Sequence, residues 1–174
     1  MIGFIILTVF VAGLMIGRTP EYLRKKIDAF DIKMVLLITL ITPFCVLIFS
    51  SIAILFGNIE NSVSSNSAYG FSQILYYFMS AGANNGSSLL GFNGNITFIN
   101  ILTGICMLIS RIVPIYGTLK LSESLSQKRL VATIEGTLST STPLFVGMLI
   151  DIIIIIGGLS FLPALALGPL AEIY

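Results

Sequence analysis

The chain has 174 residues, of which 56% are hydrophobic and 10% are charged, and its mean hydropathy is +1.02. This composition is typical of an integral membrane protein and excludes an ordinary water-soluble domain. A formal net charge of +1 gives no reason to expect nucleic-acid binding. The chain has no histidine, and Cys45 and Cys106 both lie in apolar runs. We therefore expect buried thiols, with neither a disulfide nor a transition-metal site.

Four apolar segments are long enough to be considered as membrane spans: residues 2–17, 34–56, 98–117 and 144–162. The first has about 16 residues, which is marginal for a hydrocarbon core of about 30 Å. It is not a signal peptide, because basic residues follow it and none precedes it. Pro43 permits a kink in the second span. Beyond the fourth, Pro163 and Pro169 are expected to lie outside the helix.

Basic residues concentrate in two connecting segments, residues 18–33 and 118–142, which hold all of the 9 lysines and arginines except Arg111. The positive-inside rule makes both segments cytoplasmic. Residues 57–70 contain no lysine or arginine and should lie outside. The chain is thus predicted to cross the cell membrane several times, with both termini outside. In the first segment, apolar residues recur at helical spacing and predict an amphipathic helix at the membrane surface. They are Tyr22, Leu23, Ile27 and Phe30.

A polar, glycine-bearing stretch at residues 81–88 lies between the second and third spans. The apolar, aromatic residues 71–80 before it are too few to cross a bilayer. A half-membrane helix followed by extended backbone is the architecture of a re-entrant pore loop, and its C-terminal dipole end suits a cation. Gly82 and Gly86 allow the backbone to turn its carbonyls inward. The same pattern also fits a plain extracellular loop, and both interpretations stay open on the residues alone.

Two charged residues lie inside expected spans. Arg111 is in the third span just before Pro114, and Asp151 is in the fourth. A charge at such a depth costs about 2.5 to 3.5 kcal/mol on insertion scales unless it is paired or reaches water. Arg111 can extend toward the cytoplasmic interface, or it can pair within the protein and brace the ion path. An Arg111–Asp151 charge pair is therefore one hypothesis for these positions.

Three stretches together resemble the KdpA family, the potassium-binding, channel-like component of the bacterial and archaeal Kdp potassium-transporting P-type ATPase, and specifically its C-terminal third. They are AGLMIGRTPEYL at residues 12–23, the region 80–91, and residues 136–172 with the motifs TPLFVG and PALALGP. The resemblance extends over essentially the whole chain. It implies an all-α integral membrane protein with about four transmembrane helices, one re-entrant pore helix and a filter loop.

The resemblance also implies the organisation of the chain. Residues 1–17 correspond to the last helix of one repeat, 34–117 to a complete helix, pore-loop, helix repeat, and 143–174 to a further helix and an outer tail. Residues 71–82 are then the pore helix. One quarter of a potassium filter is implied at Ala83, Asn84, Asn85, Gly86 and Ser87, with the ion held by backbone carbonyls near Gly86. The implied partners are the Kdp subunits B, C and F. ATP is hydrolysed by the first of these and is not bound here.

Two positions depart from the family pattern: Ala83 stands where a third asparagine is usual, and Asp151 where a small or apolar residue is usual. The chain also lacks three of the four filter quarters, so a complete ring of carbonyls must come from elsewhere. It is expected to be part of a split or truncated subunit, a fragment, or a self-associating chain. The alternatives are a homotetrameric cation channel and a non-conducting remnant. No phosphate-binding loop or aspartyl-phosphate motif occurs, so no catalytic residue is expected.

Overall fold

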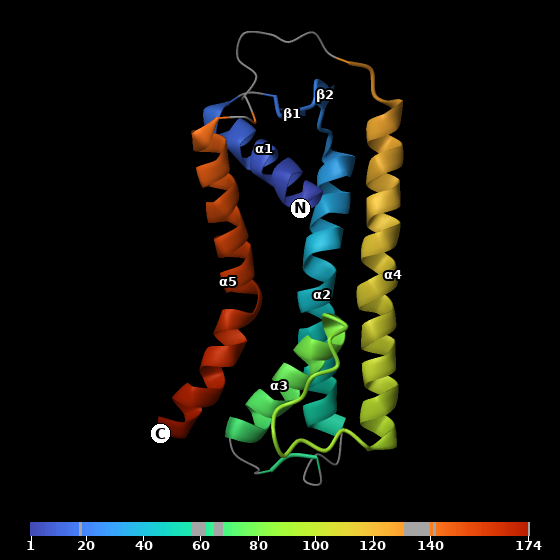
Figure 1. Ribbon diagram of the computed structural model, residues 1–174, viewed down its shortest axis with the longest axis vertical. Coiled ribbons are helices and arrows are strands. Elements are labelled where there is room, and N and C mark those ends of the chain that lie inside the picture. The colour runs from blue at the N-terminus through green and yellow to red at the C-terminus, as the bar shows by residue number, and fades with distance from the viewer. Residues whose placement is uncertain (18, 57–61, 65–67, 131–139, 141, 174) are drawn as a thin grey trace. The chain divides into compact units, whose positions relative to one another are not determined.

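The computed structural model describes residues 1–174 except 18, 57–61, 65–67, 131–139, 141 and 174. Its described elements are α1 (Ile2–Ile16), β1 (Glu21–Tyr22), β2 (Lys25–Lys26), α2 (Ala29–Phe56), α3 (Ala68–Gly82), α4 (Thr97–Gln127) and α5 (Pro143–Ile173) (Figure 1). Three of the described helices are long and apolar enough to cross a membrane: Ala29–Phe56, Thr97–Gln127 and Pro143–Ser160. The prediction of a helical, multi-pass membrane protein agrees with this architecture.

The first apolar segment forms a short helix, as the sequence predicts. α1 has 15 residues and ends where Gly17 takes a left-handed conformation with φ of 71°, its N–H directed at the carbonyls of Gly13 and Leu14. Glycine is the usual residue at such a helix end because it has no Cβ to clash. The helix is shorter than the spans above, so a fourth crossing is not confirmed.

The predicted amphipathic helix in residues 21–33 is wrong for its first half. β1 and β2 pair antiparallel there, with Glu21 opposite Lys26 and Tyr22 opposite Lys25. Leu23 and Arg24 turn the chain with φ of 51° and 63°, values that no right-handed helix allows. The hairpin places Tyr22 and Ile27 against one core, so their helical spacing reflects burial from a different local structure. α2 then begins at Ala29, five residues before the expected span.

Two helices continue beyond their predicted ends. α4 runs on to Gln127 instead of ending near Gly117, because Leu121 and Leu125 repeat at helical spacing and pack into a core. The first part of the predicted 118–142 loop is therefore helical. α5 reaches Ile173 rather than stopping before Pro163.

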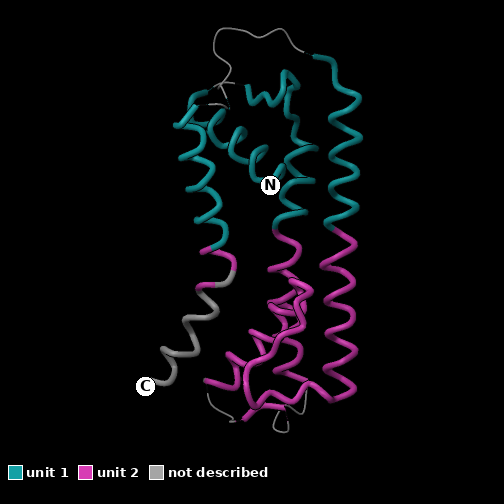
Figure 2. Tube along the Cα trace, viewed as in Figure 1, with its two compact units in different colours: residues 1–39, 114–157 teal, residues 40–113, 158–174 magenta. Residues whose placement is uncertain are grey.

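The described chain divides into two compact units (Figure 2). Unit 1 comprises residues 1–39 and 114–157, and unit 2 comprises residues 40–113 and 158–174. The core of unit 1 is formed by the buried residues Ile6, Leu7, Val9, Ile27, Ile32, Val35, Leu121 and Phe145. The core of unit 2 is formed by Cys45, Val46, Ala53, Ile74, Leu75, Phe78, Leu102 and Cys106. Both cysteines are buried and free, which confirms the expectation of structural thiols.

Candidate functional site

The candidate site in unit 2 begins at the C-terminal end of α3. Ile74, Leu75 and Phe78 bury the same side of this helix in the core, which fixes the direction in which it points. Asn84 has a φ of 59° and donates its N–H to the Ala81 carbonyl at 2.9 Å, while the Asn85 N–H reaches the Ser80 carbonyl at 2.9 Å. These two bonds form a Schellman motif, a regular way to end a helix. A short helix ending just before the predicted filter is thus present.

The chain then reverses direction. Figure 1 shows α3 running into unit 2 from the end at which α2 finishes, and the segment after it returning to that same end, where α4 begins. Gly86 lies in this return with a φ of +76°. Ala83 and residues 85–88 are exposed. Among the described residues, no backbone N–H is donated to the carbonyls of residues 83–88. The segment therefore offers an unused row of backbone acceptors on an uncovered face.

Hydroxyl groups tie the returning segment to α3. The Ser87 N–H donates to Ser80 Oγ at 2.6 Å, and the two hydroxyl oxygens of these serines are 2.9 Å apart. Tyr76 Oη lies 3.2 Å from Ser87 Oγ. Beside these groups is a hollow of about 210 Å³, which α2 also lines through Thr42. Its remaining lining residues are Tyr76, Met79, Ser80, Ala83, Asn85 and Ser87. Three predicted filter residues therefore share a cavity with the end of α3.

Gln73 anchors the other end of the returning segment. Its side chain is fully buried in the middle of α3. Nε2 donates to the Leu90 carbonyl at 2.8 Å and to Ser64 Oγ at 2.6 Å, and Oε1 accepts the Ser64 N–H at 3.1 Å. Gly91 follows with a φ of +84°, and a Cβ there would lie 2.8 Å from Ser64 Oγ. One amide thus joins the helix, the outer loop and the chain after the predicted filter.

The structure brings the predicted filter residues together but leaves the predicted charge pair untested. Residues 83–87 form one continuous segment of unit 2. Arg111 is exposed within unit 2 and Asp151 is exposed within unit 1, so their pairing stays a prediction. Sequence reasoning did not assign roles to Gln73, Ser80 and Tyr76. The available signal was three polar groups on a short, otherwise apolar helix, where each must find a hydrogen-bond partner.

The two basic connections meet in unit 1. Lys25 Nζ donates to the Leu125 carbonyl at 2.6 Å, and Lys128 Nζ donates to the Lys26 carbonyl at 2.9 Å and pairs with Asp28 at 2.8 Å. Lys128 also pairs with the fully buried Asp31. Partial burial lowers the pKa of Lys128, but hydrogen bonds to both acids outweigh it and hold that pKa above its ordinary value. The contacts require both connections to lie on the same side of a membrane.

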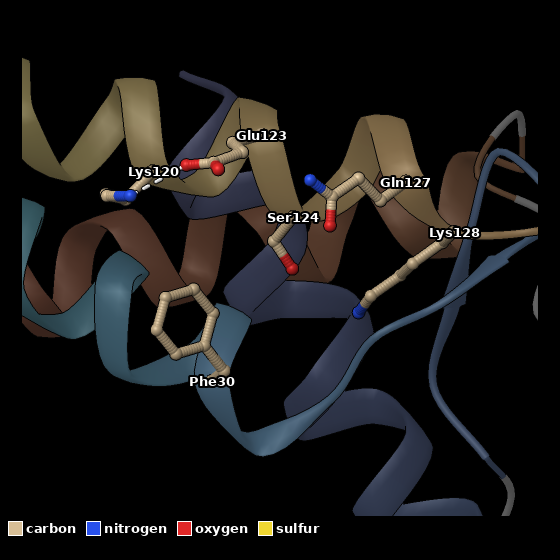
Figure 3. A pocket seen from close by; sticks show the side chains of 6 residues that line it. All are labelled: Phe30, Lys120, Glu123, Ser124, Gln127 and Lys128. Carbon is tan, nitrogen blue, oxygen red and sulfur yellow. Dashed lines mark hydrogen bonds and ion pairs between the residues drawn. The ribbon is translucent and has the colours of Figure 1, made fainter.

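A second hollow in unit 1, of about 380 Å³, is shown in Figure 3. It is lined by Phe30, Lys120, Glu123, Ser124, Gln127 and Lys128. Lys120 Nζ pairs with Glu123 at 2.8 Å, and Lys128 is engaged by Asp28 and Asp31. Both ammonium groups therefore have carboxylate partners, so the hollow presents no free positive charge to an anion. The described residues contain no group of three or more histidine, cysteine, aspartate or glutamate side chains placed to hold a metal.

Comparison with known proteins identifies the family. The sequence profile described as "Potassium-transporting ATPase A subunit" matches residues 1–174. The chain belongs to this family. It is 52% identical over 174 residues to a potassium-transporting ATPase potassium-binding subunit of Clostridium botulinum (strain Alaska E43 / Type E3), covering 100% of this chain and 30% of that protein. A protein of the same name from Listeria monocytogenes serotype 4a (strain HCC23) is 48% identical over 174 residues, again 100% of this chain, and 31% of its own length.

The chain spans about 30% of the length of the potassium-binding subunits that it matches. The predicted resemblance to this family is confirmed over the full chain. The finer prediction that the matched part is the C-terminal third is not confirmed.

Close packing at Gly82 gives a first test of this site. A Cβ on Gly82 would lie 2.8 Å from Val46 Cγ2 and 3.3 Å from Thr42 Cγ2. Gly82→Ala should therefore push the end of α3 away from α2 and lower the free energy of unfolding in detergent by about 1 to 3 kcal/mol. Gly104→Ala is the matched control, because a Cβ there meets nothing within 4 Å. The control should be neutral or stabilising. Equal effects of the two variants would contradict the packing at Gly82.

Proposed function

We propose that this chain lines part of the potassium pathway of a Kdp-type transporter, as one helix, pore-loop, helix repeat. In this proposal α3 is the pore helix and Ala83, Asn84, Asn85, Gly86 and Ser87 form one quarter of the filter. The observation that carries the proposal is the re-entrant segment itself. Its carbonyls accept no backbone N–H from the described chain, and one face of it is uncovered. Unused backbone carbonyls are the groups that replace the hydration shell of potassium in a filter.

The end of α3 supports the same proposal electrostatically. Helix dipoles sum to about half a negative charge at the C-terminal end. In α3 the carbonyls of Met79, Ser80 and Ala81 already accept N–H groups from the chain that follows. The helix end therefore supplies a field that favours a cation, while direct coordination is left to the carbonyls of residues 83–87.

The uncovered face of residues 83–88 must be completed by other pore loops. We propose that these come from another chain, and that ATP is hydrolysed by a partner, with the Kdp subunits B, C and F as the implied partners. Copies of this chain are the alternative source, as in a homotetrameric cation channel. Native mass in detergent separates the two, because four identical copies give four times the chain mass of 18.8 kDa.

The proposed orientation places unit 1 on the cytoplasmic side. Residues 18–33 and 118–142 carry most of the basic residues, and the contact between Lys25 and Leu125 joins these two segments. The positive-inside rule then makes both cytoplasmic. We also propose that α1 is a fourth crossing, which leaves both termini outside. Arg111 and Asp151 remain a proposed intramembrane pair, with extension of Arg111 toward the interface as the alternative.

Substitution of Gly86 tests the filter assignment. Gly86→Ala puts a side chain at a φ of +76°, which strains an L-residue by about 1 to 2 kcal/mol and favours a different backbone path. We expect the potassium concentration for half-maximal uptake to rise about tenfold. Gly86→Asp should also abolish growth of an uptake-deficient host on limiting potassium. The measurements are growth and potassium-stimulated uptake, with Gly104→Ala as the glycine-to-alanine control. Unchanged affinity in the Gly86 variants would overturn the filter assignment.

A further inference from the structure

The last turns of α3 hold the predicted filter through one side chain in particular. Ser80 is only 5% exposed, and its Oγ accepts the Ser87 N–H at 2.6 Å while lying 2.9 Å from Ser87 Oγ. Tyr76, one helical turn earlier, reaches only the Ser87 hydroxyl, at 3.2 Å. Ser80 is therefore the side chain that contacts the backbone of the returning segment, and Tyr76 supports it through the hydroxyl group.

This contact fixes the direction of the carbonyl before it. In a trans peptide the N–H and the C=O of one plane point in opposite directions, and the described chain has no cis peptide. The N–H of the Gly86–Ser87 plane points to Ser80 on α3. The Gly86 carbonyl must therefore point away from α3, toward the uncovered side of the segment.

Packing does not hold this peptide in place. An added Cβ at Gly86 would meet nothing within 4 Å, so no neighbouring atom blocks a rotation of the plane. Glycine also populates positive and negative φ with similar ease. The hydrogen bond from Ser87 to Ser80 is therefore the main restraint on the direction of the Gly86 carbonyl.

We propose that Ser80 is a positioning residue that aims the Gly86 carbonyl into the cation path and thereby sets affinity and selectivity among monovalent cations. This inference rests on the proposed filter function. In the Ser80→Ala variant the Ser87 N–H loses its acceptor, and the Gly86–Ser87 plane can turn its N–H toward the ion, which repels a cation. Ser80→Thr keeps the hydroxyl and should retain the bond.

The experiment compares variants in the assembled, purified transporter. Potassium and rubidium are titrated separately, and the half-maximal concentration and the maximal rate of cation-stimulated activity are measured. We expect Ser80→Ala to raise the half-maximal potassium concentration about tenfold, the scale of one lost buried hydrogen bond, and to reduce the preference for potassium over rubidium. Ser80→Thr should restore both. Ser87→Ala keeps the N–H bond and should have a smaller effect. Ser51→Ala, at an exposed serine of α2, is the matched control.

The outcomes separate this inference from the function on which it rests. A change in affinity with Gly86→Ala but none with Ser80→Ala would overturn the role of Ser80 and leave the filter assignment standing. No change with either variant would overturn both. A loss of assembled complex with unchanged half-maximal concentrations, in Ser80→Ala alone, would show a merely structural role and also overturn the inference. Loss of affinity in Ser80→Ala with rescue by Ser80→Thr supports it.

Discussion

Gln73→Leu should lower the free energy of unfolding of the chain in detergent by about 3 kcal/mol or more. The Gln73 side chain is fully buried and makes contacts to the Leu90 carbonyl and to both polar groups of Ser64. Leucine fills a similar volume but leaves these buried partners without hydrogen bonds, and each unsatisfied group costs about 1 to 3 kcal/mol. Denaturant unfolding in micelles measures the total effect.

Hydrogen exchange locates the same effect. Amide protection should fall first in residues 62–64 and 90–93, because the Asn93 N–H to Ser62 carbonyl bond of 2.8 Å depends on the same arrangement. Gln127→Leu makes the identical chemical change at an exposed position near the end of α4 and should stay within about 0.5 kcal/mol of the unsubstituted chain. Equal losses in the two variants, or unchanged protection at residues 90–93, would contradict the anchoring role of Gln73.

The re-entrant segment shows what sequence reasoning can predict about this site. A ten-residue apolar stretch before glycine and asparagine predicted a short helix near residues 71–82, and the structure has α3 at Ala68–Gly82. Gly86 has the positive φ that its identity allows. These features depend on local conformational preferences and on hydrophobic length, both of which a sequence carries directly.

The hydrogen bonds that hold the segment were not predictable in the same way. Gln73 and Leu90 lie 17 positions apart, and Ser80 and Ser87 lie 7 apart, so their pairing depends on how sharply the chain reverses after α3. Helical spacing also misled at residues 21–26, where a tight turn at Leu23 and Arg24 produces a hairpin. Tyr22 and Ile27 are buried in either structure, so periodicity alone cannot distinguish them.

Lys128→Met should be the most destabilising single change in unit 1, by about 3 to 5 kcal/mol, because it leaves the charge of Asp31 buried without its cation. Asp31 would keep the bond from Ser124 Oγ at 2.6 Å and the bond from the Asp28 N–H at 2.8 Å. Those two bonds suit a neutral amide as well. Asp31→Asn combined with Lys128→Met should therefore recover much of the loss, and a double-mutant cycle measures the coupling between the two residues. An additive cycle would contradict the pair.

The pH dependence of stability gives an independent check on the same lysine. The pKa of Lys128 is raised in the folded chain, so its contribution to stability is fully present below the unfolded lysine pKa of about 10.4 and is lost as pH rises through the raised folded value. The unsubstituted chain and Lys128→Met should therefore converge in stability above about pH 10.4. Other lysines and tyrosines also titrate there, but they titrate in both chains and cancel in the difference. A constant difference across that range would mean that the charge of Lys128 is not what stabilises Asp31, and that the loss in the variant comes from packing of the lysine stem.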